Sequence, residues 1–220
     1  MPPLPLKLQE LVLEVEALAK ASVSWECLPE IDGLMSSAIQ DGVPTIRYRE
    51  WSEAGIAEEL MHLRLMLSGV QLSFPGNRDL VGRTATMLQN VVHHHVIFPV
   101  LAKWGYQPTI AECNGISKQL STLENSNGLD RAKSDTELEA LMAIVYARGQ
   151  LDCGAPDVMA RLDSIFSAGA LSNARQIGNR VASAIRGQTE ISPEACLKTL
   201  VECLNVLGLS NVITISSRHA

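Results

Sequence analysis

Signals for the start of helices recur along this chain, and they constrain its fold more than any other feature of the sequence. Such a signal is an N-cap residue before an apolar-periodic segment, or a capping box in which glutamate follows serine or threonine by three residues. The chain has them at Ser52, Thr109–Glu112, Ser134–Glu137 and Ser192, which precedes Pro193. Together with apolar spacings of three and four residues, they predict helices between Ser52 and Gly69 and at residues 6–21, 77–104, 109–125, 135–149, 155–168, 171–187 and 193–207.

Short strands are expected mainly near the N-terminus. Val23–Leu28 has β-branched and aromatic residues, and apolar and basic residues alternate in Thr45–Arg49. Val212–Ile215 is either a short strand or a tail, and Pro99 should kink or split the helix that contains it. The fold expected is α+β and predominantly helical, with a small N-terminal sheet followed by a helical C-terminal half. Residues 1–110 form its first region, and residues 111–220 form a helical region that either continues the same domain or is a second one.

Composition limits the partners of the chain. A hydrophobic content of 46% is ample for a sizeable core. The net charge is -6 and the positive charges are scattered, which argues against a nucleic-acid surface. No apolar run reaches the ~18 residues that a membrane span needs, and the N-terminus lacks the pattern of a signal peptide. We therefore expect a cytoplasmic protein that binds neither nucleic acid nor a membrane.

The five cysteines predict free thiols. Their number is odd and no two form a C-x-x-C pair, which fits reduced thiols in a cytoplasm better than a disulfide framework or a zinc knuckle. Cys196 and Cys203 are seven residues apart and so lie on one helical face, where we expect them to be core residues.

The segment between Ser52 and Gly69 contains a pattern with the spacing of a zinc site. Its residues 58–62 read Glu-Glu-Leu-Met-His. Residues four apart lie on the same face of a helix, so Glu58 and His62 present a carboxylate and an imidazole to the same point. Both groups are normal zinc ligands. Glu59 flanks that point, where a zinc peptidase has the glutamate that activates water.

A third ligand is expected from the histidine triplet His93, His94 and His95. Successive helical residues point about 100° apart, so only one of the three should face a given site. With Glu58 and His62, that histidine completes a set of one carboxylate and two imidazoles. This set suits Zn²⁺, and also Fe²⁺ as in oxygenase triads. Four of the five histidines lie in these two segments, and the fifth, His219, lies in the tail.

Two other interpretations of these residues remain. Glu58 and Glu59 are also what a solvated helix face would contain, with His62 as a hydrogen-bonded core histidine. The sequence Glu59-Leu60-Met61-His62 also has the E-x-x-H spacing of a carboxylate-bridged di-iron bundle. That architecture needs a second E-x-x-H on another helix, and the sequence has none.

The second histidine segment carries a longer resemblance. Its residues Asn90, His94, Ile97, Phe98, Pro99, Leu101, Gly105, Tyr106 and Pro108 match N-x-x-x-H-x-x-I-F-P-x-L-x-x-x-G-Y/F-x-P. In this respect, residues 40–110 resemble a group of uncharacterised bacterial zincin-like proteins in which this segment follows H-E-L-x-H-L. The resemblance implies a minimal zincin-like core, with Glu59 as the general base and with His62 and His94 as metal ligands. Glu58 stands where the group has its first histidine ligand.

Two functions follow as expectations. The first is a zincin-like metal-dependent hydrolase, in the manner of a peptidase acting on a peptide substrate. In it, Glu58, His62 and His94 bind Zn²⁺, or less favourably Fe²⁺, and Glu59 is the general base. The alternative is a catalytically degenerate zincin that acts as a protein-binding scaffold, which the replacement of the first histidine by Glu58 favours. The sequence identifies no particular substrate, protein partner or oligomeric state.

Overall fold

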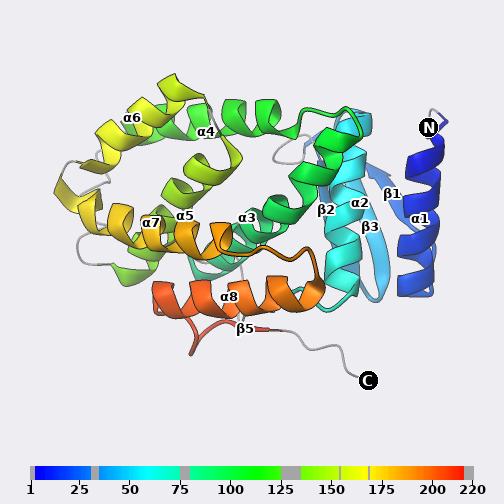
Figure 1. Ribbon diagram of the computed structural model, residues 1–220. Coiled ribbons are helices and arrows are strands. Elements are labelled where there is room, and N and C mark those ends of the chain that lie inside the picture. Colours follow the sequence, from blue (N-terminus) through cyan, green and yellow to red (C-terminus); the bar gives the residue numbers. More distant parts are fainter. Residues whose placement is uncertain are drawn as a thin grey trace. The chain divides into compact units, whose positions relative to one another are not determined.

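The computed structural model describes residues 3–30, 35–74, 80–124, 135–153, 155–167 and 169–215. These residues form two compact units (Figure 1). The first unit contains the described residues up to Gln71 together with Ile97–Pro108, and the second contains Leu72–Val96 and the described residues from Thr109 onward. The described chain has eight α-helices and a three-stranded sheet near its N-terminus, so the predicted predominantly helical α+β class is confirmed. The predicted division at residue 110 stays a prediction.

The sheet of the first unit consists of β1 (Ser24–Cys27), β2 (Met35–Gln40) and β3 (Val43–Tyr48). β3 lies in the middle, parallel to β1 and antiparallel to β2. The strands expected at Val23–Leu28 and Thr45–Arg49 are confirmed as β1 and β3. β2 and β3 form a hairpin whose two turn residues, Asp41 and Gly42, both have positive φ, as a type I′ turn requires.

Two helices of the first unit pack against this sheet and each other. In α1 (Leu6–Ala19) the buried residues Leu8, Leu11 and Val15 have helical spacing, and α1 packs along α2 (Glu53–Leu67). The predicted N-cap of α2 is confirmed, because the Ser52 hydroxyl accepts a hydrogen bond from the backbone N–H of Gly55. The register of α2 follows from its apolar residues Ile56, Leu60 and Leu63, which are fully buried. α2 also packs on β2, and its Glu59 contacts Ser37 of that strand.

The helix α3 (Leu80–Lys103) belongs to the second unit as far as Val96 and to the first unit from Ile97. The expected start at Asn77 lies outside the described residues. Pro99 lies inside α3, which continues to Lys103, so the helix is not split there, and the alternative expectation of a kink stays a prediction. Proline removes one backbone N–H donor and crowds the carbonyl four residues earlier.

The second unit contains the remaining helices. They are α4 (Pro108–Glu124), of which Pro108 alone belongs to the first unit, α5 (Thr136–Asp152), α6 (Pro156–Ser167), α7 (Ser172–Arg186) and α8 (Pro193–Leu207). A short 3-10 helix, η2 (Gly169–Leu171), precedes α7, and β4 (Leu72–Ser73) pairs antiparallel with β5 (Thr214–Ile215). These helices begin and end within three residues of the predicted positions, and residues 125, 134 and 168 of the predictions lie outside the described residues.

Two of the predicted helix caps differ in detail from expectation. α8 begins as predicted, with the Ser192 hydroxyl accepting from the N–H of Ala195. α5 begins with Asp135 as its N-cap, whose carboxylate accepts from two backbone N–H groups. α4 begins at Pro108, so Thr109 lies in its first turn and is not its N-cap. A proline in the first turn explains this start, because its missing N–H is not needed there.

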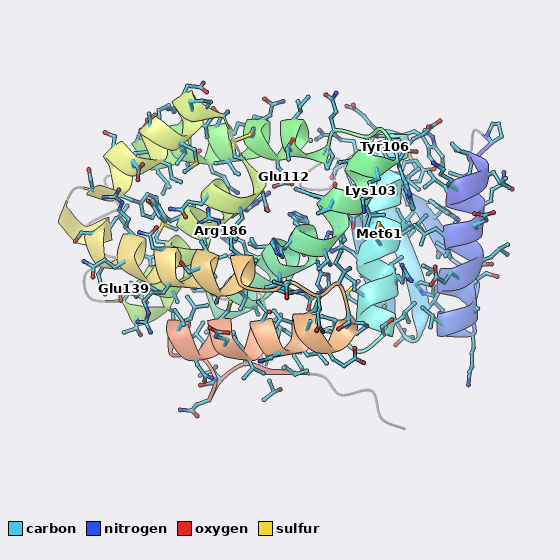
Figure 2. All side chains as sticks on the ribbon, viewed as in Figure 1. Met61, Lys103, Tyr106, Glu112, Glu139 and Arg186 are labelled. Carbon is cyan, nitrogen blue, oxygen red and sulfur yellow. A yellow bond between two sulfur atoms is a disulfide. The ribbon has the colours of Figure 1, made fainter. Side chains whose placement is uncertain are left out.

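The core of the second unit lies around α5, which is buried on several faces and packs along α7. The two backbones approach closely at Gly178, where an added Cβ would lie 2.6 Å from the carbonyl oxygen of Ala143. A side-chain contact also joins the two helices, since Asn173 of α7 donates to the carboxylate of Glu139 on α5 at 2.7 Å. Glu139 is labelled in Figure 2. α7 therefore holds the N-terminal half of α5 through contacts at Glu139 and Ala143.

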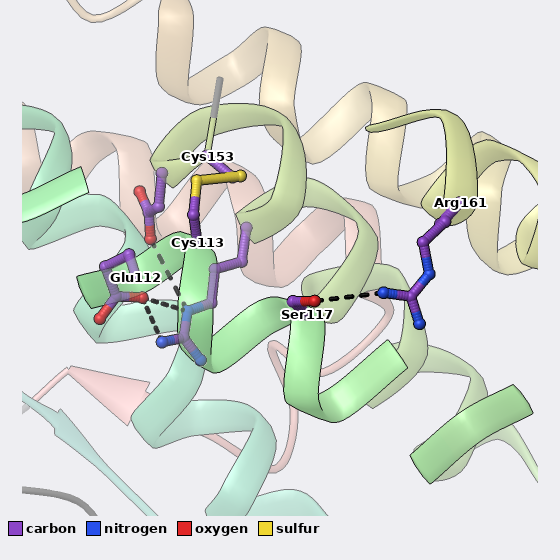
Figure 3. The surroundings of a disulfide bond; sticks show 7 residues. Glu112, Cys113, Ser117, Cys153 and Arg161 are labelled. Atoms are coloured by element: carbon purple, nitrogen blue, oxygen red, sulfur yellow. Dashed lines mark hydrogen bonds and ion pairs between the residues drawn. A yellow bond between two sulfur atoms is a disulfide. The ribbon is translucent and has the colours of Figure 1, made fainter. Parts of the chain in front are cut away.

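The prediction that all cysteines are free thiols is wrong for two of them. Cys113 and Cys153 form a disulfide that joins α4 to the residue after α5 (Figure 3). Forty residues separate them, so no short motif marks the pair. Cys27 is exposed and free, and the prediction that Cys196 and Cys203 are core residues is confirmed. In the part of the chain that the structure describes, no helix combines the length and the apolar character needed to cross a membrane.

Candidate functional site

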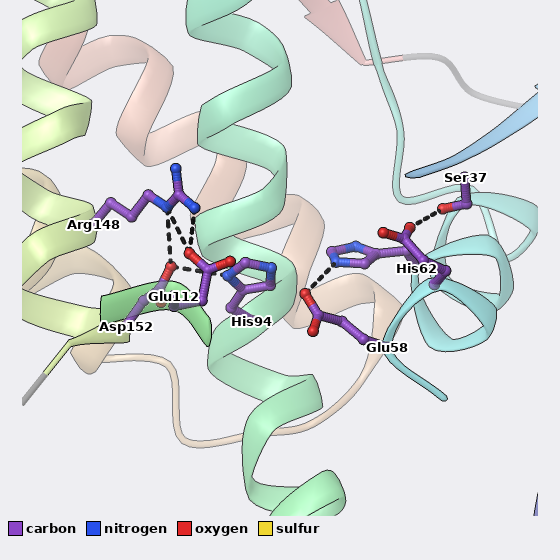
Figure 4. A network of polar contacts seen from close by, with 8 residues as sticks. Ser37, Glu58, His62, His94, Glu112, Arg148 and Asp152 are labelled. Carbon is purple, nitrogen blue, oxygen red and sulfur yellow. Dashed lines mark hydrogen bonds and ion pairs between the residues drawn. The ribbon is translucent and has the colours of Figure 1, made fainter. Parts of the chain in front are cut away.

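The first unit holds two of the three predicted metal ligands on one face of α2. Glu58 Oε1 lies 4.0 Å from His62 Nε2, and their side chains are 20% and 7% exposed. This is the contact that the i, i+4 spacing predicts. The helix itself thus brings a carboxylate and an imidazole together in a mostly shielded position (Figure 4).

Glu59, the predicted general base, is held by the neighbouring strand. The hydroxyl of Ser37 on β2 donates a hydrogen bond to Glu59 Oε2 at 2.6 Å. A hydrogen bond to a carboxylate fixes its orientation and favours its charged form. The pattern of the sequence gave no sign of Ser37, because the strand β2 was not predicted and Ser37 is 22 residues from Glu59.

The second unit holds the third predicted ligand, His94, in a buried polar pair. His94 Nδ1 lies 2.8 Å from Asp152 Oδ2, and the two side chains are 3% and 2% exposed. α3 supplies the histidine and the last residue of α5 supplies the carboxylate. A ring nitrogen bonded to an ionised carboxylate carries the proton, which defines Nε2 as the nitrogen with a lone pair in the neutral imidazole.

A further ion pair extends this contact. Arg148, one turn before Asp152 on α5, donates through Nε and Nη2 to the same oxygen of Glu112 on α4, at 2.9 Å from Nε. Its Nε also lies 3.8 Å from Asp152 Oδ2. Figure 4 shows contacts from the guanidinium to both carboxylates. The Arg148 charge compensates the Asp152 carboxylate, which would be costly to bury alone.

The three consecutive histidines have different surroundings, as the helical geometry predicts. His94 is paired with Asp152, whereas His95 Nε2 lies 3.3 Å from the backbone oxygen of Gln188. His93 is fully buried. In the described residues, His94 thus lies against a carboxylate and His95 lies near a backbone oxygen.

The second unit also contains a group of residues with the composition of a metal site. His94, Glu112 and Asp152 each offer a ligand atom, and these atoms lie within 4.8 Å of one another. The predicted triad itself is divided, since Glu58 and His62 belong to the first unit and His94 to the second. Each unit thus contains a histidine beside a carboxylate.

The sequence analysis did not identify three charged residues near His94 as site residues: Glu112, Arg148 and Asp152. They are 18, 54 and 58 residues from His94 along the chain, and they lie on α4 and α5, outside the segment that carries the family resemblance. The only local signal is that Glu112 and Asp152 each directly precede a disulfide cysteine. Comparisons with protein-family models, with curated proteins and with solved structures find no match to this chain.

Proposed function

We propose that this protein is a zinc-dependent hydrolase of the zincin-like kind, in which Glu58, His62 and His94 bind the metal and Glu59 is the general base. The observation that carries the proposal is the buried contact between His94 Nδ1 and Asp152. Histidines that bind metals through one ring nitrogen almost always donate a hydrogen bond from the other, commonly to a carboxylate. Asp152 has that role for His94.

The donor atoms of the first unit fit the metal. Two ligands of a tetrahedral zinc with bonds of about 2.0–2.1 Å are roughly 3.3 Å apart. The distance between Glu58 Oε1 and His62 Nε2 is 4.0 Å, so one of the two side chains would have to move closer on binding. One carboxylate and two imidazoles are also the ligand set of several catalytic zinc sites.

The chemical roles of the residues follow from their types. A bound zinc ion would act as a Lewis acid and would lower the pKa of a bound water molecule to near neutral. Glu59 accepts the proton of that water at a carboxylate oxygen, while Ser37 holds its Oε2. The Glu58 carboxylate in place of a neutral histidine adds negative charge, so the water should be less acidic than in a site with three histidines. We therefore expect slow hydrolysis of a peptide substrate.

The alternative donor set His94, Glu112 and Asp152 is less favourable for a cation. The guanidinium of Arg148 bonds Glu112 through two nitrogens and also lies near Asp152. A divalent ion placed between these carboxylates would be repelled by that charge and would have to displace it. The same ion pair suits a supporting role, because it orients Asp152 towards His94.

The test is the zinc content of untagged protein purified without chelator or metal resin, compared with single variants. We expect about one zinc per chain in the native protein, with loss in His62→Ala and in His94→Ala. His95→Gln is the matched control, because it removes the adjacent imidazole of the same helix and should keep the zinc. Glu59→Gln should keep the zinc and lose hydrolysis of peptide substrates.

Other metal contents would each point to a different site or function. Zinc that persists in His62→Ala but is lost in Glu112→Gln would assign the metal to the second unit alone. Iron in place of zinc would retain the ligands and redirect the search to redox chemistry. Absence of metal even after zinc is added back would refute the hydrolase and leave the protein-binding scaffold. Glu58→His offers a complementary check, because restoring the usual ligand should tighten zinc binding.

A further inference from the structure

The disulfide lies directly beside the residues that support His94. Cys113 follows Glu112 on α4, and Cys153 follows Asp152 at the end of α5. The Cα atoms of the two cysteines are 4.9 Å apart. One covalent link therefore joins the chain positions next to both carboxylates that contact Arg148 (Figure 3).

α4 depends on this link more than its neighbours do. α5 packs closely along α7, and α7 along α8, but α4 makes no comparably extensive backbone approach to any described element. Besides its buried Ile116 and Leu120, its ties are ionic and polar. Arg148 bonds Glu112 near its start, and Arg161 of α6 bonds Ser117, Ser121 and Glu124 further along. The disulfide is the one covalent tie of this helix to α5.

A chain of contacts leads from the disulfide to the histidine. The bond holds Glu112 against Arg148, whose Nε lies between Glu112 and Asp152. Asp152 in turn is 2.8 Å from His94 Nδ1. Breaking the link frees the start of α4 and the residue after Asp152 together. The network loses the restraint at both ends, and the orientation of the Asp152 carboxylate is no longer fixed.

We infer that Cys113–Cys153 is a reversible redox site that controls metal binding by His94, an inference that rests on the proposed role of His94 as a ligand. In the oxidised form Asp152 fixes the His94 ring for binding, and in the reduced form that orientation is loosened. Affinity for zinc is therefore higher in the oxidised protein. Loss of an outer-shell partner typically lowers metal affinity about 10- to 100-fold, and the change on reduction should lie in that range.

The chemistry of the switch is thiol–disulfide exchange with a dithiol reductant. Cys113 is partly exposed and Cys153 is buried, so a thiolate of the reductant reaches Cys113. It attacks the sulfur of Cys113, the S–S bond breaks, and Cys153 leaves as a thiolate that takes up a proton. The second thiol of the reductant then displaces Cys113 and becomes part of the reductant's own disulfide. The protein gains two electrons and two protons, and the dithiol is oxidised by the same amount.

Two measurements on the full chain test the inference. The first is zinc affinity, by competition with a chromophoric chelator, for the oxidised protein and for Cys113→Ser/Cys153→Ser. The second uses the metal-free protein: ¹⁵N signals of the histidine rings, with His94 assigned by their absence in His94→Gln, before and after reduction by a phosphine. Circular dichroism confirms that each sample is folded. Cys27→Ser is the matched control, since it removes a free exposed thiol and should leave both readouts unchanged.

We expect weaker zinc binding and changed His94 signals in the reduced protein. Glu112→Gln retains the disulfide, so it tests the contacts that lead from the disulfide through Arg148 and Asp152 to His94, even if the double variant fails to fold. In this variant, zinc affinity and His94 signals should differ less between the oxidised and reduced forms. Reduction that is complete by mass and leaves His94 signals and zinc affinity unchanged would overturn the inference. If the oxidised protein binds no zinc, the hydrolase proposal fails separately. A change in the His94 signals on reduction would then still support the link between disulfide and histidine, and unchanged signals would refute it.

Discussion

Removing the Cys113–Cys153 bond should lower the stability of the folded chain by about 4 kcal/mol. The bond closes a loop of 40 residues. The loop-closure entropy of the unfolded chain for that length is about 13 cal/mol/K, which amounts to about 4 kcal/mol at 25 °C. This is a large part of the roughly 5–15 kcal/mol by which a typical domain is stable. For a chain of this size, we expect the melting temperature to fall by roughly 8–16 °C.

The structure gives reasons to expect the full effect. α5 packs along α7, and Arg161 of α6 bonds Glu124 near the end of α4, so most of the loop keeps its native contacts when the bond is broken. The bond therefore acts mainly on the unfolded chain, where it removes conformations.

The assay is urea unfolding at 25 °C, followed by circular dichroism, for the native protein and for Cys113→Ser/Cys153→Ser. Both are measured with a chelator present, because a metal that binds the folded form would add its own stabilisation. Cys27→Ser provides the control, and native protein in reductant should match the double variant. A loss of less than about 1 kcal/mol, or an equal loss in the control, would contradict the entropic argument.

Three further predictions test other parts of the structure. Asp152→Asn should weaken zinc binding about 10- to 100-fold in the chelator competition, because an amide no longer holds the proton on Nδ1 of its histidine partner; unchanged affinity would exclude the positioning role. Gly178→Ala should destabilise the fold by about 1–3 kcal/mol in urea, because its Cβ would lie 2.6 Å from a backbone oxygen of α5. Its control Gly115→Ala, with open space around the Cβ, should be neutral or stabilising. Burial, with a smaller contribution from a neighbouring glutamate, raises the pKa of Cys203 to about 12. Its alkylation at pH 8 should be much slower than that of the exposed free thiol Cys27, and it should accelerate about tenfold per pH unit up to pH 11, because only the thiolate reacts. Equal rates at pH 8, measured by mass spectrometry of the folded protein, would contradict that pKa.

Most of the helical architecture could be predicted from sequence because its signals are local. Ser52 and Ser192 cap the helices they were expected to cap, and the apolar spacing of α1 and α2 corresponds to their buried faces. The strand β2 was missed for a related reason. Its residues, MSSAIQ, lack a run of β-branched side chains, and its pairing depends on the Asp41–Gly42 turn and on β3. A strand whose formation depends on its neighbour has only a weak signal in its own sequence.

For the candidate site too, contacts within one helix could be predicted from sequence, and contacts between residues far apart in the chain could not. Glu58 and His62 could be paired from sequence because one helix turn determines their contact. Among the three histidines, helical geometry predicted different directions for each, but it could not identify the one that meets a carboxylate. That choice depends on Asp152, which lies 58 residues further along the chain and at the end of another helix.

The disulfide is a further contact that the sequence did not predict, and it determines which residues lie beside it. An odd number of cysteines without a short motif gave no reason to pair Cys113 with Cys153. Once they are paired, however, the residues before them must also come close, because neighbouring Cα atoms are about 3.8 Å apart. The pairing alone would therefore have brought Glu112 and Asp152 together and required a cation between two like charges in a poorly hydrated place. Arg148 meets that requirement from one turn earlier on α5. The charge network beside His94 thus lies next to a long-range covalent link that the sequence pattern did not reveal, which is also why we expect breaking that link to affect the histidine.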